Sequence, residues 1–238
     1  MRKAIVIGAS SGIGYELVCQ LAALGWKVAA LARTEEKLLE LQAKYPSVIP
    51  IRHDVTEYAS VPALLIDITG QLGGLDLLIY SSGVMPSVAA DEFDFLKDKG
   101  MVDVNVLGAV AWMNEGARRM QGSRAGTLMA IGSVAGDRGR AGQPVYNATK
   151  AFLHSYMESL RNRLSRLGVH VVTVRPGPVL TPMTAHLHFK KALTAQDAAG
   201  RILKYIDKRG DYYLVPAHRL IFFVIRSVPS WIFRRLNI

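Results

Sequence analysis

The sequence predicts an α/β fold in which a parallel sheet is covered by helices on both faces. Short apolar runs typical of buried strands alternate with helical patterns along the chain. A glycine-rich turn joins the first apolar run to the first helical pattern. The length of 238 residues lies in the range in which one α/β domain forms a single core. We therefore expect one doubly wound domain of the Rossmann type.

The predicted elements follow one another through most of the chain. Strands are expected at residues 4–7, 28–31, 48–52, 77–80, 127–131 and 169–174. Helices are expected from the glycine turn to Gly25 and at residues 35–44, 61–72, 102–120 and 146–167. Neither an internal repeat nor a low-complexity linker divides the sequence.

The apolar segments also bear on where the protein is found. Four strongly apolar residues stand between Lys3 and Gly8, too few for a secretory signal. No stretch reaches the roughly 18 apolar residues that a membrane-spanning helix needs. We therefore expect a cytoplasmic protein. Its single cysteine, Cys19, is expected to be a small core residue rather than a reactive thiol.

The positive charge is concentrated toward the C-terminus. The formal net charge is +10, and residues 186–238 hold ten Lys or Arg against three Asp or Glu, which is +7 of it. No nucleic-acid motif and no zinc-ligand cluster accompanies these basic residues in the sequence. We therefore expect neither a nucleic-acid partner nor a metal site.

The glycine-rich turn is suited to a dinucleotide. It follows the first strand and opens the first helix, where bare N–H groups and the positive end of the helix dipole can hold a pyrophosphate. Glycine allows the close approach that this requires. The expected cofactor-binding residues of the turn are Gly8, Ser10, Ser11, Gly12, Ile13 and Gly14.

Arg33 and Thr34 follow the second strand, where a carboxylate would accept hydrogen bonds from a free ribose 2′-hydroxyl. An arginine fork and a hydroxyl suit a 2′-phosphate instead, so NADP(H) is expected rather than NAD(H). The alternative is a solvated arginine at the start of a helix.

Two further strand ends are expected to contact the cofactor. Asp54 and Val55 follow the third strand, where the acid could cap the next segment or meet the adenine amino group. Ser81, Ser82 and Gly83 follow the fourth strand, and their small size would let the chain pass close to a ribose.

Tyr146 and Lys150 are expected to act as a pair. They are four residues apart in a helical pattern, so their side chains lie on one face about a turn apart. A nearby cation favours the phenolate and brings the pKa of a tyrosine toward the working range of proton transfer. Ser133 follows an apolar strand at the edge where ligands bind. Asn105 stands among apolar helical neighbours and needs a specific partner.

These motifs together resemble the short-chain dehydrogenase/reductase family over roughly residues 3–215. The order and approximate spacing are similar to those of the family for the glycine turn, Asp54-Val55, Asn105, Ser133, Tyr146-x-x-x-Lys150 and Pro176-Gly177. Two motifs depart from the family. The fourth strand ends in Tyr80-Ser81-Ser82-Gly83 where Asn-Asn-Ala-Gly is usual. The glycine turn has Ser11 where many NADP-preferring members carry a basic residue, so Arg33 carries the 2′-phosphate expectation almost alone.

The resemblance implies a catalytic tetrad. Tyr146 would donate a proton to a carbonyl oxygen while the nicotinamide delivers hydride to the carbon, and Ser133 would position that oxygen. Lys150 would lower the pKa of the tyrosine and hold the nicotinamide ribose. Asn105 would hold a water that links Lys150 to solvent.

The resemblance also implies the surroundings of the nicotinamide. Pro176 and Gly177 would lie beside it, and Val179 and Thr181 would meet its carboxamide. Residues 184–191 would form a mobile substrate loop, and the protein would be a homodimer or homotetramer built on the two long helices.

The C-terminal segment, residues 217–238, is apolar, aromatic and basic, and it holds no acid. We treat it as a helical extension of a domain that spans residues 1–216. It could lie on the inner face of a membrane as a peripheral helix, or pack over the substrate pocket or against a second subunit. In each case an apolar wall near the pocket would favour a hydrophobic substrate.

The sequence therefore predicts an NADP(H)-dependent oxidoreductase that interconverts a ketone or aldehyde and an alcohol. The substrate would be a small or lipid-like hydrophobic molecule. The alternative is a non-catalytic NADP(H)-binding regulator or membrane-surface scaffold. A sugar-nucleotide epimerase shares the Tyr-x-x-x-Lys chemistry but usually needs a longer C-terminal substrate domain than this length allows.

Overall fold

A seven-stranded parallel sheet forms the centre of the molecule in the computed structural model, which describes residues 1–187, 189 and 191–236. The strand order is β3-β2-β1-β4-β5-β6-β9. The strands are β1 (Lys3–Ile7), β2 (Lys27–Ala32), β3 (Val48–Arg52), β4 (Leu77–Tyr80), β5 (Thr127–Ile131), β6 (His170–Arg175) and β9 (Gly210–Tyr213). The order reverses between β1 and β4, which places a ligand crevice outside the carboxyl ends of these strands.

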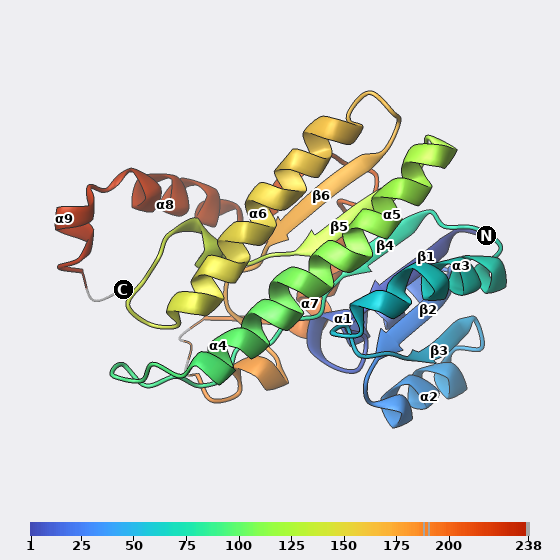
Figure 1. Ribbon diagram of the computed structural model, residues 1–238, viewed down its shortest axis with the longest axis horizontal. Coiled ribbons are helices and arrows are strands. Elements are labelled where there is room, and N and C mark those ends of the chain that lie inside the picture. The colour runs from blue at the N-terminus through green and yellow to red at the C-terminus, as the bar shows by residue number, and fades with distance from the viewer. Residues whose placement is uncertain (188, 190, 237–238) are drawn as a thin grey trace.

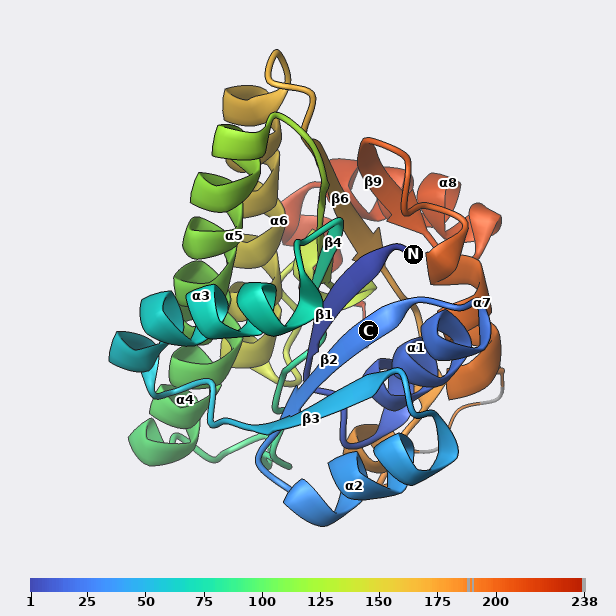
Figure 2. The ribbon, with the colours of Figure 1, turned by 90° about the vertical axis from the view of Figure 1, so that its right-hand side faces the viewer.

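Helices cover both faces of this sheet, as Figures 1 and 2 show. One face packs against α1 (Gly12–Ala23), α2 (Glu35–Lys44) and α7 (Ala195–Leu203). The other face packs against α3 (Val61–Leu72), α5 (Ala109–Ser123) and α6 (Pro144–Leu164). The predicted single-domain α/β fold with helices on both faces is therefore confirmed.

The central strands are buried on both faces because each of their side chains meets one helical layer or the other. Residues 4–7 are fully buried, and their alternate side chains belong to two separate apolar cores. Such strands have continuous apolar sequences, which is why their positions were visible in the sequence. Cys19 is buried in the first of these cores, in keeping with its expected role.

One predicted helix is divided in the structure. The pattern at 102–120 is part of a longer run made of α4 (Phe95–Val102), a π-helical segment (Asp103–Gly108) and α5. The wider π turn places Asn105 in the interior, where it is 1% exposed. Such turns are frequent at functional sites, and hydrophobic periodicity alone does not reveal them.

The C-terminal part adds elements that the sequence analysis did not predict. β9 is a strand of four half-buried residues, which gives little alternation between buried and exposed side chains. α7 is only nine residues long, and two of its three buried side chains are alanines, Ala198 and Ala199. A short parallel pair is formed by β7 (Val179–Leu180) and β8 (Leu193–Thr194). The chain then continues into α8 (Pro216–Ser227) and α9 (Ser230–Phe233), so the expected helical character of the C-terminal segment is present in its described residues; residues 237 and 238 lie outside them.

Candidate active site

A cavity of about 530 Å³ lies at the carboxyl edge of the sheet. Its walls come from the loops that follow β1, β2, β3, β4, β5 and β6, together with the start of α6. Most of the predicted site residues line it: Gly8, Ser10, Ser11, Gly12, Ile13, Gly14, Arg33, Asp54, Val55, Ser81, Ser82, Gly83, Ser133, Tyr146, Lys150, Pro176, Gly177, Val179 and Thr181. Thr34 and Asn105 are not part of its wall.

The glycine turn is packed so closely that two of its glycines have no room for a side chain. A Cβ atom on Gly14 would lie 1.9 Å from the carbonyl oxygen of Gly8. Gly8 has a φ of +91°, and a Cβ there would lie 2.6 Å from the Ser82 nitrogen. This packing brings the turn against the end of β4. It leaves the N-terminus of α1 open to the cavity, in the arrangement that suits a pyrophosphate.

The start of α1 is suited to an anion. Within the described residues, the Ser11 side chain makes no capping hydrogen bond, and the first turn of α1 contains no acidic residue. The N–H groups of this turn and the positive end of the helix dipole therefore face the cavity without a competing carboxylate. A dinucleotide phosphate fits this end of the cavity.

Arg33 lies beside Asp54 at the far end of the same cavity. The Arg33 guanidinium is 3.9 Å from the Asp54 carboxylate, and its side chain is 69% exposed. Asp54 accepts hydrogen bonds from the N–H and hydroxyl of Thr56 at 2.9 and 2.8 Å. The carboxylate thus caps the next turn, which was one of its two expected roles. Thr34 is exposed and precedes α2, so the 2′-phosphate argument depends on Arg33.

Tyr146 and Lys150 lie side by side on α6 and are buried at the other end of the cavity. The Lys150 ammonium is 5.7 Å from the centre of the Tyr146 ring and donates to the carbonyl oxygen of Ile131 at 3.1 Å. Ser133 follows β5, and its hydroxyl accepts from the N–H of Ala135 at 3.0 Å. The structure therefore brings three of the four predicted tetrad residues to one wall.

Burial dominates the protonation of this pair. It raises the pKa of Tyr146 above its ordinary value, while the Ser133 hydroxyl and the charge of Arg140 act in the opposite direction. Burial also lowers the pKa of Lys150 to about 8. The lowered tyrosine pKa that the resemblance implied is thus not the net direction here, because desolvation disfavours both charged forms.

Asn105 acts on the loop after β4 rather than on the cavity itself. Its amide oxygen accepts from the N–H of Val84 at 2.8 Å, and its amide nitrogen donates to the Val84 oxygen at 3.0 Å and to Thr149 at 3.2 Å. These contacts fix the backbone beside Gly83. A role for Asn105 in a water relay stays a prediction.

Several residues of the cavity wall were not predicted from the sequence. Arg140 and Gln143 lie in the segment between Ser133 and α6, and Asn147 follows Tyr146 within α6. The only available signal was an arginine in a glycine-rich stretch, which is also typical of an exposed loop. Leu187 and Phe189 of the expected substrate loop line the cavity as well, whereas residues 188 and 190 lie outside the described residues.

Comparison with known proteins places the chain in a family. The family model for short chain dehydrogenases matches residues 2–192. The chain belongs to the short-chain dehydrogenase/reductase family. It is accordingly an NAD(P)-dependent oxidoreductase. This membership agrees with the resemblance seen in the motifs.

Two bacterial proteins described as oxidoreductases are similar to this chain. A protein described as an uncharacterized oxidoreductase of Myxococcus xanthus is 37% identical over 192 residues, which are 79% of this chain and 76% of the relative. One from Staphylococcus epidermidis is 30% identical over 206 residues, 85% of this chain and 89% of the relative.

Solved structures of the family share the fold. A structure described as ElxO with NADP bound superposes with a TM-score of 0.83 at 19% identity, over 92% of this chain and 99% of the other. A short-chain type dehydrogenase/reductase from Mycobacterium ulcerans gives 0.81 at 20% identity, over 89% and 87%. At these identities the likeness concerns the fold alone.

The described residues lack two kinds of feature. No helix among them combines the length and apolarity that crossing a bilayer would need. Those residues also contain no group of three or more His, Cys, Asp or Glu side chains placed to hold a metal ion.

Proposed function

We propose that the protein uses NADP(H) to interconvert a ketone or aldehyde and an alcohol on a hydrophobic substrate, with Tyr146 as the acid and base. One observation carries this proposal. A single cavity has an anion-binding helix start and Arg33 at one end, and Ser133, Tyr146 and Lys150 at the other. This arrangement suits a molecule that has phosphates at one end and reacts at the other.

The proposed chemistry assigns each proton to a residue of this chain. The bound nicotinamide supplies or accepts the hydride. In reduction, the Tyr146 hydroxyl gives its proton to the carbonyl oxygen, which becomes the alcohol oxygen, and the Ser133 hydroxyl donates a hydrogen bond that positions the same oxygen. Protonated Lys150 stabilises the resulting phenolate, which is then reprotonated from solvent. Oxidation runs these steps in reverse.

The preference for NADP(H) is supported by the charge at the end of β2. Arg33 lines the cavity there, and no Asp or Glu occupies positions 32–34 to accept a ribose hydroxyl. A guanidinium can bind a 2′-phosphate through two charge-assisted hydrogen bonds. When a 2′-phosphate binds, the Arg33 guanidinium would leave the Asp54 carboxylate and contact the phosphate instead.

The hydrophobic substrate is supported by the wall next to Tyr146. Apolar side chains from two separate segments line the cavity: Val84 and Met85 after β4, and Met183, Leu187 and Phe189 between β7 and β8. Such a lining stabilises an apolar ligand by removing its surface from water.

The experiment is NADPH oxidation by the purified protein with a panel of apolar ketones and aldehydes. The wild type is expected to consume NADPH, and Tyr146→Phe to lose activity by about a hundredfold or more while still binding NADPH. Turnover retained by Tyr146→Phe would remove this residue from the mechanism. NADPH binding by the wild type without turnover on any carbonyl would favour the non-catalytic regulator instead.

The proposal includes a cytoplasmic homodimer or homotetramer, with a peripheral contact to a membrane. Figure 1 shows α4, α5 and α6 along one side of the molecule. Apolar Val102, Leu107 and Phe152 are exposed there. A contact between copies through these helices would cover them. Sedimentation of the wild type and of Phe152→Glu tests this, and an unchanged oligomer in the variant would contradict it.

A further inference from the structure

The outer face of α8 is apolar, and the rest of the described chain leaves it exposed. Leu220 and Phe223 are 70% and 62% exposed, and Ile221 and Val224 are also exposed. The inner face packs through Phe222, whose ring stacks on Tyr213 at 6.2 Å. Contiguous exposed apolar side chains of this size usually mark a binding surface.

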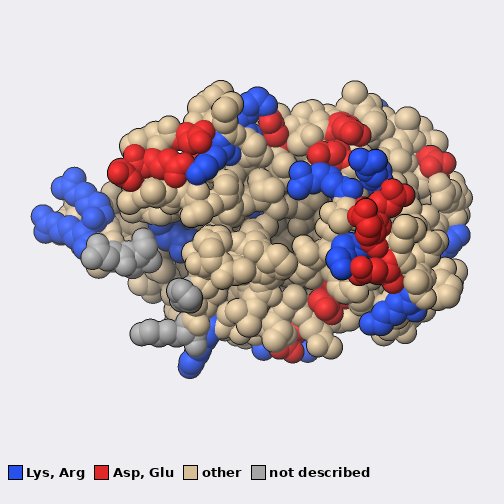
Figure 3. All heavy atoms as spheres, turned by 90° about the horizontal axis from the view of Figure 1, so that it is seen from below, with Lys and Arg blue, Asp and Glu red and all other residues tan. Residues whose placement is uncertain are grey.

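The same surface continues into α9 and is bordered by arginines. Trp231 in α9 is 59% exposed. No Asp or Glu follows Asp211 in the sequence, whereas four arginines do: Arg219, Arg226, Arg234 and Arg235. In Figure 3 basic side chains gather at the end of the molecule where Figure 1 places α9. The surface is therefore both apolar and cationic.

Side chains from the loop after Ser133 hold this surface in place. Arg138 donates to the Arg226 carbonyl oxygen at 3.0 Å and to the Ser230 hydroxyl at 3.3 Å. Its guanidinium also lies 4.5 Å from the centre of the Phe233 ring. The two helices are thus attached beside the active site with their apolar side outward, so binding does not have to order them.

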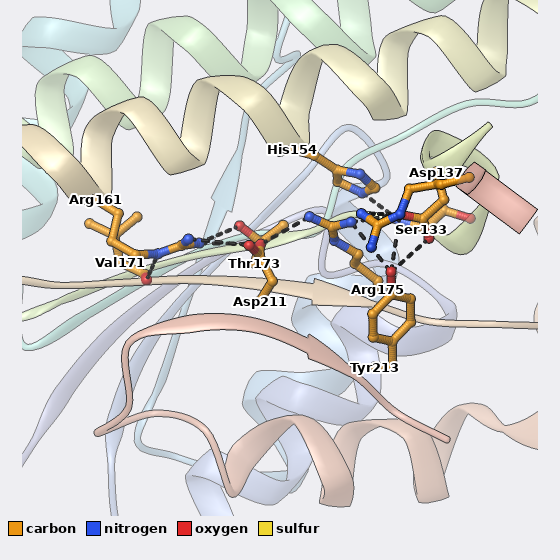
Figure 4. A network of polar contacts seen from close by, with 10 residues as sticks. Ser133, Asp137, His154, Arg161, Val171, Thr173, Arg175, Asp211 and Tyr213 are labelled. Atoms are coloured by element: carbon orange, nitrogen blue, oxygen red, sulfur yellow. Dashed lines mark hydrogen bonds and ion pairs between the residues drawn. The ribbon is translucent and has the colours of Figure 1, made fainter. Parts of the chain in front are cut away.

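Asp137 adds a second attachment from the same loop. Its carboxylate is fully buried, accepts from Arg175 at 2.6 Å and from the Tyr213 hydroxyl at 3.1 Å, and lies 3.9 Å from Arg226. Figure 4 shows Asp137, Arg175 and Tyr213 converging near Ser133. The C-terminal helices and the loop that carries Ser133 are therefore parts of one connected structure.

The charge of the surface distinguishes between two occupants. A second copy of this chain bound through the same face would place arginines opposite arginines without an acid from this segment to pair them. An anionic bilayer instead offers negative headgroups to the arginines, an apolar interior to Leu220 and Phe223, and an interfacial layer that suits Trp231.

We propose that residues 216–236 form a docking surface for an anionic lipid bilayer. The helices lie in the plane of the interface, and the attachment through Arg138 and Asp137 brings the active-site end of the molecule to the membrane. The docking makes specific the membrane contact included in the proposed function, but it does not depend on the proposed reaction. The further step, that a hydrophobic substrate enters from the bilayer, rests on it.

The test is co-sedimentation of the full chain with vesicles. We expect binding to mixed phosphatidylcholine and phosphatidylglycerol vesicles at low ionic strength. Binding to vesicles of phosphatidylcholine alone should be weaker by about tenfold or more. Changing Arg234 and Arg235 together to Ala should weaken binding to the mixed vesicles about thirtyfold. The matched control is the adjacent exposed pair Arg118 and Arg119 on α5, whose change to Ala should leave binding unaltered.

The apolar part of the surface is tested by Phe223→Glu, which should weaken binding by about tenfold or more. Ile66→Glu on α3 is its control, since Ile66 is 71% exposed on another helix. Thermal unfolding of each variant shows that the fold is intact. Equal binding to both vesicle types, or equal loss in target and control variants, would overturn the proposal. So would an oligomer that Phe223→Glu dissociates while the wild type fails to bind vesicles.

Vesicle binding does not require turnover, so its outcome is separate from that of the proposed function. An inactive protein that binds anionic vesicles keeps the docking surface and loses the proposed reaction. A protein that is active but does not bind anionic vesicles would support the proposed reaction and contradict the docking surface.

Discussion

Lys150 lies one helical turn after Tyr146 and is buried, with its ammonium 5.7 Å from the centre of the tyrosine ring. The pair therefore shares an environment that disfavours charge. For Lys150 this lowers the pKa to about 8 in the folded protein, against an ordinary value of 10.5. The difference makes the free energy of unfolding depend on pH.

The first prediction follows from this difference. Between the two pKa values the unfolded chain binds a proton at Lys150 that the folded protein does not, so stability rises with pH in this window. The free energy of unfolding of the wild type should increase relative to that of Lys150→Met by about 2 kcal/mol between pH 7 and 9.5 without cofactor. Urea unfolding of both proteins across this range measures it. A difference that does not change with pH would show that Lys150 titrates normally.

The second prediction concerns Arg33 and the choice of cofactor. Arg33→Ala removes a charge-assisted contact to a 2′-phosphate, so the KM for NADPH should rise about tenfold or more. The KM for NADH should change less than about twofold, because NADH lacks this phosphate. Steady-state kinetics with both cofactors measure the ratio, and Arg118→Ala serves as a control. Equal rises in the KM for NADPH and for NADH would mean that Arg33 does not bind the 2′-phosphate.

The parts that the sequence predicted well share a local physical cause. The strand at 77–80 and the helices at 35–44 and 61–72 agree with the structure because burial imposes a continuous apolar run or helical periodicity. The strand at 48–52 also agrees with the structure, although it lies at the edge of the sheet and is half-buried. The glycine turn was visible because its conformation excludes other residues. The fold class and the glycine turn at the phosphate-binding end of the cavity could therefore be predicted from short segments of sequence.

The parts that were missed depend on contacts between distant segments. Asp137 is buried because Arg175 and Tyr213, 38 and 76 residues further along the chain, meet it. Nothing in its neighbourhood distinguishes it from an exposed loop aspartate. Arg140 reaches the cavity wall for a similar reason, because the fold of the whole loop after Ser133 decides where it lies.

The third prediction compares two glycines that both lie inside helices. Gly14→Ala places a Cβ atom 1.9 Å from the Gly8 carbonyl oxygen, so the turn must move and both stability and cofactor binding should fall. We expect a loss of about 2 kcal/mol or more in the free energy of unfolding. In α3, the Cβ atom of Gly70→Ala would meet no atom of the described residues within 4 Å, and this change should stabilise the protein by about 0.5 to 1 kcal/mol. Thermal or urea unfolding measures both, and the same sign for both variants would contradict the packing argument.

The fourth prediction concerns the ion pair between Asp137 and Arg175. Asp137→Asn removes the negative charge from a fully buried position and leaves the Arg175 guanidinium with Asp211 at 3.4 Å as its remaining acid. Because breaking one partner of a buried pair strands the other charge, the loss of stability should be about 3 kcal/mol. The exposed pair of Arg2 and Asp207 is the control, and Asp207→Asn should cost about 0.5 kcal/mol or less. Urea unfolding at neutral pH measures both losses.

Equal small losses of stability in the two variants would mean that Asp137 is not essential to this core. A large loss with a shifted pH profile for carbonyl reduction would show that the loop carrying Ser133 depends on this buried pair.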